Sequence, residues 1–276
     1  MSGTPDVRLR LPNLPENVAL VRQALTGLAG SIGIDDSLLA DIKTAVSEAC
    51  NNVVLHAYDN GGVGPLDVYV CPSGHEVAVV VKDQGTGIQP RAPDPDAAMQ
   101  GVGLSLIQAL TRSVEFGGGD GEGTEVRMEF HSEAPLDVPE SDDDGDAAVP
   151  APPQGETVVS ASDPLVAPVL SSVIAVLAAR AGFSVERLSE AQLVTDAIAA
   201  HAGSAFVGPH VHAGIDTTPH QLELRLGPLV DGGSDTLVAA SAVGGLAPVL
   251  ERLADDVTAE SRDGHEELRL VISDRH

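Results

Sequence analysis

Aromatic side chains are almost absent from this chain of 276 residues: Phe, Tyr and Trp together make up 2%, and Trp does not occur. Hydrophobic residues still make up 43% of the sequence, so a packed core must be built from Ala, Val, Leu and Ile. The only cysteines, Cys50 and Cys71, lack C-x-x-C spacing, which excludes a disulfide framework and a cysteine zinc site. We expect two small thiols in a reducing cytoplasm.

Basic residues are also scarce. The chain has 15 Lys and Arg against 41 Asp and Glu, and its formal net charge is −26. This balance excludes the clustered basic surface that follows nucleic-acid phosphates. It does not identify a partner, since net charge bears on solubility and association.

Long apolar runs are missing as well. The longest, Leu165 to Ala179, is interrupted by Pro168, Ser171 and Ser172, is too short to span a bilayer and is typical of a core helix. The first residues contain no apolar run that could serve as a signal peptide. We therefore expect a cytoplasmic protein without a membrane segment.

An acidic segment divides the chain. Residues 132–155 contain seven acidic residues and no basic one, with Pro and Ala in most other positions. Such a segment cannot bury enough apolar surface to offset its ordering entropy, so it is predicted to be a mobile linker. This gives one domain at 1–131 and a second at 156–276.

The two domains resemble each other in sequence. The segment from Leu14 to Ile34 aligns without gaps on the segment from Asp163 to Phe183, with Pro15 opposite Pro164 and Gly33 opposite Gly182. Each segment is typical of a helix that begins at Pro and ends at Gly. Two such units indicate a duplication.

Hydrophobic periodicity predicts the elements of the first domain. We expect strands at 7–11, 66–71, 77–82 and 125–131, and helices at 16–31, 36–57 and 103–112. Helices on one face of a mostly antiparallel sheet give an α+β two-layer sandwich.

The predicted helix 36–57 contains the first candidate site residues. Its apolar residues repeat every three or four positions, which predicts a buried stripe. Glu48 and Asn52 are four residues apart, so they lie one above the other beside that stripe. An Asn-Asn pair, Asn51-Asn52, is unusual inside a helix unless a ligand uses it.

Three glycine-containing segments follow. Asp83 and the turn Gly85-Thr86-Gly87 come directly after an apolar strand, where a backbone without side chains can approach a flat ligand. Gly101 and Gly103 open a helix, whose N-terminal N–H groups attract phosphate. Gly123-Thr124 precedes the last strand. Taken singly, each segment could simply be a turn.

The order of the four segments carries more information than any one of them. The helix segment Glu48–Ala57 resembles the N box of the GHKL superfamily of ATPases, and the later segments resemble its G1 box (Asp83–Gly87), G2 box (Gly101–Leu104) and G3 box (Gly123-Thr124). Within that superfamily, the residues around Glu48 look like those of anti-sigma-factor serine kinases. The resemblance implies a Bergerat-type ATP-binding fold over residues 8–131.

This resemblance implies roles for the residues of the N box. Asn52 would bind Mg²⁺, which also takes ATP phosphate oxygens and water. Glu48 would be the general base that accepts a serine proton during transfer of the γ-phosphoryl group. His56 matches a recurring residue of the family, although a helix-end histidine without a role is an equal interpretation.

The same resemblance assigns the nucleotide contacts to the glycine boxes. Asp83 would accept a hydrogen bond from the exocyclic amine of adenine, and Gly85 and Gly87 would give the base room. Gly101 and Gly103 would surround the phosphates. Thr124 would support the adenine pocket.

One stretch departs from the family pattern. The segment Ile88–Gln100 is short, and Arg91 is its only basic residue, whereas the kinases often have a longer lid with an Arg just before the G2 box. The resemblance implies an ATP-dependent serine kinase that phosphorylates an anti-sigma-factor antagonist and binds a sigma factor. Alternatives are a nucleotide-gated binding protein without useful catalysis and a stand-alone ATPase.

The second domain resembles a degenerate copy. With Thr195–Ala197 placed over Ser47–Ala49, Ala200 replaces Asn52, and Pro228 falls on Asp83. Gly244-Gly245-Leu246 keeps part of the G2 box, with Val243 at its first glycine. We expect this copy to bind no ATP and to act as a pairing partner, because the family's kinases commonly act as dimers.

Overall fold

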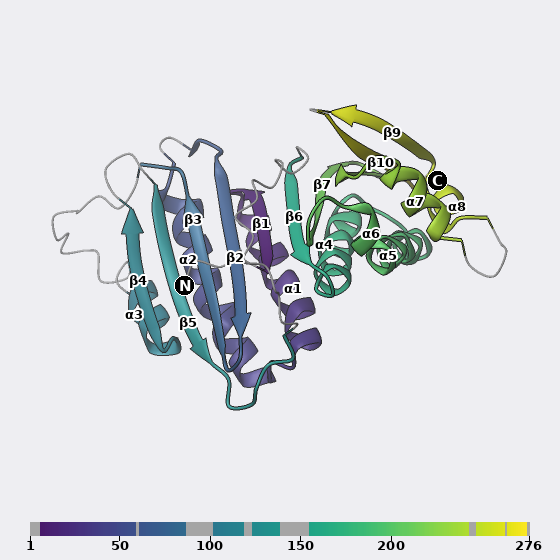
Figure 1. Ribbon diagram of the computed structural model, residues 1–276. Helices are drawn as coiled ribbons and strands as arrows, with labels where there is room; N and C mark the ends of the chain where they lie inside the picture. The colour runs from purple at the N-terminus through teal and green to yellow at the C-terminus, as the bar shows by residue number, and fades with distance from the viewer. Residues whose placement is uncertain are drawn as a thin grey trace. The chain divides into compact units, whose positions relative to one another are not determined.

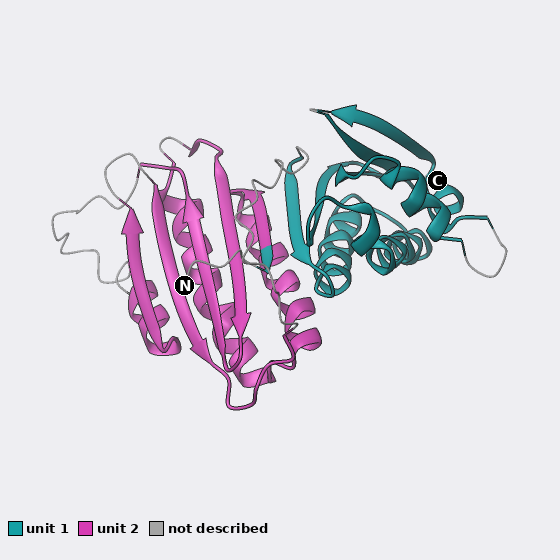
Figure 2. Cartoon of the chain, viewed as in Figure 1, with its two compact units in different colours: residues 1–7, 139–276 teal, residues 8–138 magenta. Residues whose placement is uncertain are grey.

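The computed structural model describes residues 6–58, 61–86, 102–118, 123–138, 155–242, 247–262 and 264–274. The chain forms two compact units (Figure 2). One comprises residues 8–138, and the other comprises residues 139–276 together with residues 1–7.

The first unit is an α+β sandwich in which helices cover one face of a five-stranded sheet (Figure 1). In chain order its elements are β1 (Val7–Pro12), α1 (Pro15–Ile32), α2 (Asp36–His56), β2 (Pro65–Ser73), β3 (Glu76–Asp83), α3 (Val102–Leu110), β4 (Ser113–Gly118) and β5 (Thr124–His131). The strand order is β4-β5-β3-β2-β1. The β2–β3, β3–β5 and β4–β5 pairings are antiparallel. The predicted fold class is confirmed.

Alternation along the strands builds the core of this unit. In β3 the side chains of Val77, Val79 and Val81 are buried while the residues between them are half-exposed. Successive side chains in a strand point to opposite faces, so each strand turns one apolar face to the helices.

The caps fix where the first two helices begin and end. Helix α1 begins at Pro15 and ends at Ile32, and the cap residue Gly33 has a φ of 77°, a left-handed conformation that favours glycine. The Ile34 N–H then donates to the Ala29 carbonyl at 3.0 Å. Asp35 begins α2 by accepting hydrogen bonds from two backbone N–H groups of its first turn. As a result α2 starts at a defined residue, which sets where Glu48 and Asn52 lie.

Strand β4 was missing from the sequence prediction. Five of its six residues are exposed, and it ends in two glycines, so it lacks the apolar alternation of the other strands. Its pairing with β5 holds it in place, with Phe116 opposite Val126. A strand at the edge of a sheet depends on such distant partners, which local sequence does not reveal.

The first unit also extends beyond the predicted domain boundary. Ser132 N–H donates to the His75 carbonyl, Leu136 N–H to Gly74 and Asp137 N–H to Ile32, at 2.7 to 3.0 Å. The first seven residues of the predicted linker therefore belong to the first unit, which ends at Val138. Residues 139–154 of that linker lie outside the described residues.

The second unit repeats the order of the first. Its elements are β6 (Thr157–Ser162), α4 (Val166–Arg180), α5 (Val185–Ala200), α6 (Ala202–Ala205), β7 (His210–Thr218), β8 (Gln221–Leu229), α7 (Gly233–Ala240), α8 (Val249–Leu253), β9 (Asp256–Arg262) and β10 (His265–Ser273). Its strand order, β9-β10-β8-β7-β6, matches β4-β5-β3-β2-β1 element for element. Two short helices, α6 and α7, are additions.

The register of the two units agrees at the first helix. Gly182 follows α4 with a φ of 82°, and the Phe183 N–H donates to the Ala178 carbonyl at 3.0 Å. This is the bond that Ile34 makes to Ala29 after Gly33 in the first unit. The gapless alignment of the two segments therefore corresponds to the same helix end in both units.

Continuing that register corrects one sequence assignment. It pairs the α2 cap Asp35 with Ser184, which caps α5. It also matches buried residues with buried residues: Ile42 with Ala191, Ala45 with Val194, Val46 with Thr195 and Ala49 with Ile198. Placing Thr195–Ala197 over Ser47–Ala49 was wrong by one residue, since it set the exposed Leu193 against the buried Ala45. Ala197 corresponds to Glu48, and His201 instead of Ala200 corresponds to Asn52.

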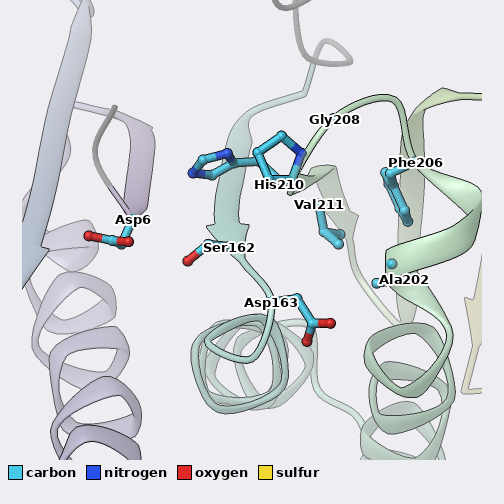
Figure 3. A pocket seen from close by; sticks show the side chains of 10 residues that line it. Asp6, Ser162, Asp163, Ala202, Phe206, Gly208, His210 and Val211 are labelled. Atoms are coloured by element: carbon cyan, nitrogen blue, oxygen red, sulfur yellow. The ribbon is translucent and has the colours of Figure 1, made fainter. Parts of the chain in front are cut away.

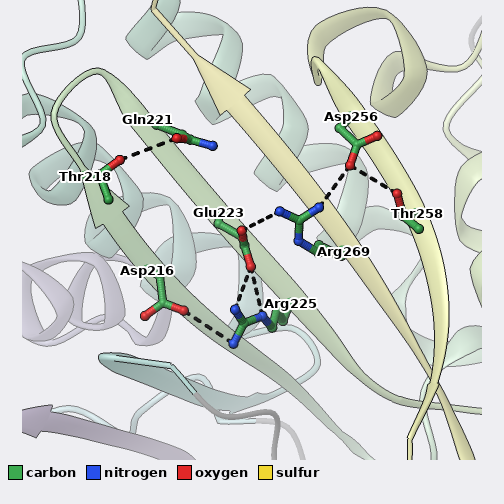
Figure 4. Close-up of polar contacts among 8 residues, drawn as sticks. All are labelled: Asp216, Thr218, Gln221, Glu223, Arg225, Asp256, Thr258 and Arg269. Carbon is green, nitrogen blue, oxygen red and sulfur yellow. Dashed lines mark hydrogen bonds and ion pairs between the residues drawn. The ribbon is translucent and has the colours of Figure 1, made fainter.

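A chain of ion pairs crosses one face of the second sheet (Figure 4). The Glu223 carboxylate on β8 binds Arg225 and Arg269, each at 2.7 Å. Arg269 continues to Asp256 on β9 at 3.0 Å, and Arg225 to Asp216 on β7 at 3.4 Å. Hydrogen bonds from Arg269 and then Arg225 hold the pKa of Glu223 below its usual value. Glu223 therefore stays ionised at neutral pH, and the network ties four strands together.

Within the part of the chain that the structure describes, no helix combines the length and the apolar character needed to cross a membrane.

Candidate functional site

Helix α2 presents Glu48 and Asn52 on the flank of its buried stripe. The stripe contains Ala45 and Ala49, both almost fully buried, whereas Glu48 and Asn52 are half-exposed. Neither side chain forms a hydrogen bond or ion pair with any residue that the structure describes. A carboxylate and a carboxamide thus stand one helical turn apart, available to a ligand.

The first turn of α3 lies against Glu48. A Cβ atom added to Gly103 would stand only 2.0 Å from the Oε1 atom of Glu48. Glycine is therefore needed here for the carboxylate to keep its place. The structure brings together Glu48 and Gly103, two residues predicted from separate boxes, and sets a helix N-terminus beside the carboxylate.

Asp83, the last residue of β3, is 1% exposed. Its Oδ1 atom accepts hydrogen bonds from the backbone N–H groups of Gly85 at 2.8 Å and Thr124 at 3.1 Å. None of the described residues donates to its Oδ2 atom. Two bonds to one oxygen orient the carboxylate and leave the second oxygen as an acceptor. Thr124 contributes here through its backbone.

Close backbone contacts surround Asp83. A Cβ atom on Gly85 would lie 1.9 Å from the Ala57 carbonyl oxygen at the end of α2. A Cβ atom on Gly123, whose φ is 77°, would lie 2.1 Å from the Asp83 carbonyl oxygen. Both contacts are with backbone, which cannot move aside as a side chain does. Gly85 therefore allows the loop after β3 to meet the end of α2, and Gly123 allows the loop before β5 to meet the end of β3.

Tyr58 belongs to this arrangement although the sequence analysis gave it no role. Its hydroxyl donates to the Pro65 carbonyl at 2.6 Å and accepts the Gln84 N–H at 3.1 Å. The sequence offers one signal, since Tyr58 is one of only two tyrosines. His56, two residues earlier, is exposed at the end of α2, and no hydrogen bond or ion pair with a described residue gives it a role.

Some predicted site residues lie outside the described part of the chain. They are Gly87 of the G1 box, Gly101 of the G2 box and the segment 88–100 with Arg91. In the second unit, Val243 and the Gly244–Leu246 segment lie outside it as well.

The donor set of the first unit fits a magnesium ion better than a metal held by protein alone. Among the described residues, no group of three or more His, Cys, Asp or Glu side chains could hold a metal. Mg²⁺ needs only one or two protein oxygens when phosphates and water supply the rest. The carboxamide oxygen of Asn52, half-exposed beside Glu48, could serve as such a ligand.

The corresponding positions of the second unit lack these groups. Ala197 and His201 stand where the first unit has Glu48 and Asn52. The β7–β8 hairpin pairs Thr218 with Gln221 as the β2–β3 hairpin pairs Ser73 with Glu76, so Pro228 corresponds to Asp83. Neither a carboxylate nor a carboxamide remains at the three positions.

The second unit has a small cavity of its own (Figure 3). It encloses about 210 Å³ and is lined in part by Ser162, Asp163, Phe206 and His210. The buried Ser162 hydroxyl has no hydrogen-bond partner among the described residues. Ligand pockets usually enclose about 300–1,000 Å³, and none of Ala197, His201 and Pro228, which correspond to Glu48, Asn52 and Asp83, lines this cavity.

Comparison with known proteins agrees with the first unit's geometry. Residues 11–130 match the family model of the histidine kinase-like ATPase domain. The serine-protein kinase RsbW of Halalkalibacterium halodurans is 35% identical over 121 residues, which are 40% of this chain and 74% of that protein. The anti-sigma F factor of Thermoanaerobacter sp. is 30% identical over 140 residues, which are 46% of this chain and 94% of that protein.

Among solved structures, the RsbU and RsbW domains of a Mycobacterium tuberculosis protein show 26% identity and a TM-score of 0.36. The likeness covers 49% of this chain and 34% of that one, and it is too low to support an argument about the fold.

The fold and boxes of the first unit define an ATP-binding domain of the GHKL type. The chain belongs to the histidine kinase-like ATPase family, and its relatives there include serine-protein kinases and anti-sigma factors. The family match ends at residue 130, so the second unit lies outside it.

Proposed function

We propose that the chain is an ATP-dependent protein serine kinase that phosphorylates an anti-sigma-factor antagonist and also binds a sigma factor. The observation that carries this proposal is the pair Glu48 and Asn52, half-exposed and without described partners beside Gly103. The names of the relatives support the same chemistry. Both proposed partners are cytoplasmic, and we propose that compartment for this chain.

Glu48 is the proposed catalytic base. Its carboxylate takes the proton of the substrate serine as the serine oxygen forms a bond to the γ-phosphorus of ATP. The bond between that phosphorus and the oxygen bridging to the β-phosphate breaks, and ADP leaves. The Oε1 atom of Glu48 is the atom nearest to the Cβ position of Gly103, in the first turn of α3, where phosphate would bind.

Asn52 and Asp83 are the proposed anchors of the nucleotide. Asn52 would hold Mg²⁺ through its carboxamide oxygen. The ion would neutralise charge on the phosphate oxygens. Asp83, fixed through Oδ1 by Gly85 and Thr124, would accept the adenine amine with Oδ2. Gly85 and Gly123 keep side chains out of that corner, while Gly87 and Gly101 are proposed contacts of base and phosphate.

Removing the metal ligand should uncouple ATP binding from magnesium. We expect Asn52→Ala to weaken Mg²⁺-dependent ATP binding by about tenfold or more, because even indirect partners of a bound metal contribute that much. The neighbouring Asn51 is exposed on the same helix, so Asn51→Ala is the matched control. Calorimetric titration of the full chain with and without Mg²⁺ measures the effect, and equal affinities for both variants would remove Asn52 from the site.

A second candidate is a nucleotide-gated binding protein that captures its partner without transferring phosphate. The sequence of segment 88–100 favours it, since Arg91 is the only basic residue there. Glu48 opposes it, because a pure binder does not need a carboxylate at that place. A stand-alone ATPase is a third reading without an observation of its own.

We infer that the second unit arose by duplication and lost its nucleotide site. The matching order of strands and helices and the shared helix end at Gly33 and Gly182 support the duplication. The groups at Ala197, His201 and Pro228 cannot replace a base, a carboxamide ligand and a carboxylate acceptor.

This inference predicts that ATP protects only the first unit. Hydrogen exchange of the full chain with and without Mg·ATP should slow for amides within residues 8–138. The Asp83→Asn chain, with the first site damaged, provides the control. ATP-dependent protection of residues 155–274 that persists in that chain would reveal a second nucleotide site and contradict the inference.

A further inference from the structure

Tyr58 joins three parts of the first unit through one hydroxyl group. The hydroxyl donates to the carbonyl of Pro65, the first residue of β2, at 2.6 Å. It accepts the N–H of Gln84, the residue after β3, at 3.1 Å. Tyr58 itself lies just beyond α2. Its hydroxyl therefore links the end of the N-box helix to the start of the G1 box.

The ring of Tyr58 has a fixed place. A Cβ atom on Gly64 would lie 2.1 Å from the Cε1 atom of the ring, so the ring packs directly on the Gly64 backbone. Asn13 holds that backbone from the other side, because its side chain accepts the Gly64 N–H at 2.8 Å and its own N–H donates to the Gly64 carbonyl at 3.0 Å. The hydroxyl is thus held on a rigid support.

Ala57, the residue before Tyr58, contacts the same turn after Asp83. The Ala57 carbonyl accepts the Thr86 N–H at 2.9 Å, and Gly85 lies against that carbonyl with no room for a Cβ atom. Two consecutive residues at the helix end therefore contact three consecutive residues after Asp83. Helix α2, with Glu48 and Asn52, is fixed relative to the turn that orients Asp83.

We propose that Tyr58 is a positioning residue for base selection, whose hydroxyl holds the Gln84–Gly85 turn so that the Asp83 carboxylate keeps its direction. The Asp83 Oδ1 atom accepts the Gly85 N–H, and the place of Gly85 follows from that of Gln84. Without the hydroxyl, the Gln84 N–H loses its hydrogen-bond acceptor, and the Oδ2 atom of Asp83 is no longer held in one direction. The inference rests on the proposed function, in which the Oδ2 atom of Asp83 accepts a hydrogen bond from the adenine amine.

The test uses the preference for ATP over GTP, because guanine carries a carbonyl where adenine carries the amine. Tyr58→Phe keeps the ring in its place and removes both hydrogen bonds. We expect the ratio of the GTP to the ATP dissociation constant to fall about fivefold, the worth of a typical hydrogen bond. Tyr69→Phe, at the only other tyrosine, is the matched control and should keep the wild-type ratio.

The outcomes separate this inference from the proposed function. If the wild-type chain binds no ATP, the proposed function fails. If the wild type prefers ATP and Tyr58→Phe keeps the same ratio, whether or not its melting temperature falls, Tyr58 is structural and the inference fails. Should Tyr58→Phe not fold, incorporation of 3-fluorotyrosine makes the Tyr58 hydroxyl oxygen a weaker hydrogen-bond acceptor. An unchanged ratio of the GTP to the ATP dissociation constant in that folded chain overturns the inference equally.

Discussion

Replacing Glu48 with Gln should lower serine phosphorylation by about 10²- to 10⁴-fold, the usual contribution of a general base, while ATP affinity stays nearly unchanged. The amide has the size of the carboxylate but cannot take the serine proton. Glu48 is half-exposed and makes no hydrogen bond or ion pair with a described residue, so its loss should leave folding intact. Initial rates with an antagonist protein, together with ATP titration, measure the two effects separately.

The matched control for this change is Glu133→Gln. Glu133 is exposed just after β5 and forms no hydrogen bond or ion pair within the described part of the chain, so its loss should alter neither rate nor affinity. A Glu48→Gln chain that phosphorylates as fast as wild type would show that another group accepts the proton. A large loss of ATP affinity would instead place Glu48 among the nucleotide ligands.

Replacing Asp83 with Asn should weaken ATP binding by about 10- to 150-fold, because a hydrogen bond to a charged group contributes about 1.5–3 kcal/mol. The amide oxygen of Asn can still accept the two N–H groups that bind Oδ1, from Gly85 and Thr124, so the loops stay in place. Its NH₂ group then occupies the Oδ2 position and faces the adenine amine. Both groups are hydrogen-bond donors, so no hydrogen bond forms between them. The affinity for GTP should fall much less, because guanine has a carbonyl group where adenine has the amine.

Titration of the Asp83→Asn chain with ATP and GTP measures this change. Asp41→Asn is the control, since it makes the same substitution on α2 away from the glycine boxes and should leave both affinities unchanged. If ATP and GTP weakened equally, Asp83 would support the loops without reading the base, and the adenine assignment would be wrong.

Periodicity and box order predicted the fold of the first unit well. The buried stripe of α2 follows from spacing alone, and Asp35, Pro15 and Gly33 mark helix ends through local chemistry. The contact between Glu48 and Gly103 could be expected only from the resemblance, because these residues lie far apart in the sequence. Local sequence patterns predict the helices and the buried strands. The order of the boxes predicts that loops far apart in the sequence lie close together.

Two features could not be predicted from the sequence. Strand β4 is held by pairing with β5 and has little apolar pattern of its own. Tyr58 acts through hydrogen bonds to backbone atoms of Pro65 and Gln84, and any residue type can supply such atoms. The one-residue error in aligning α5 on α2 had a similar cause. In alanine-rich helices the residue types do not distinguish one alignment register from the next, and the pattern of burial decides between them.

We propose that the chain transfers phosphate from ATP to a serine of an antagonist protein. The most direct measurement is mass spectrometry of a candidate antagonist, encoded beside this chain, after incubation with the full chain and Mg·ATP. We expect one added phosphate on a serine with the wild-type chain and almost none with Glu48→Gln. An antagonist that stays unmodified, yet binds the chain differently with ATP and with ADP, would contradict the kinase and establish the nucleotide-gated binder.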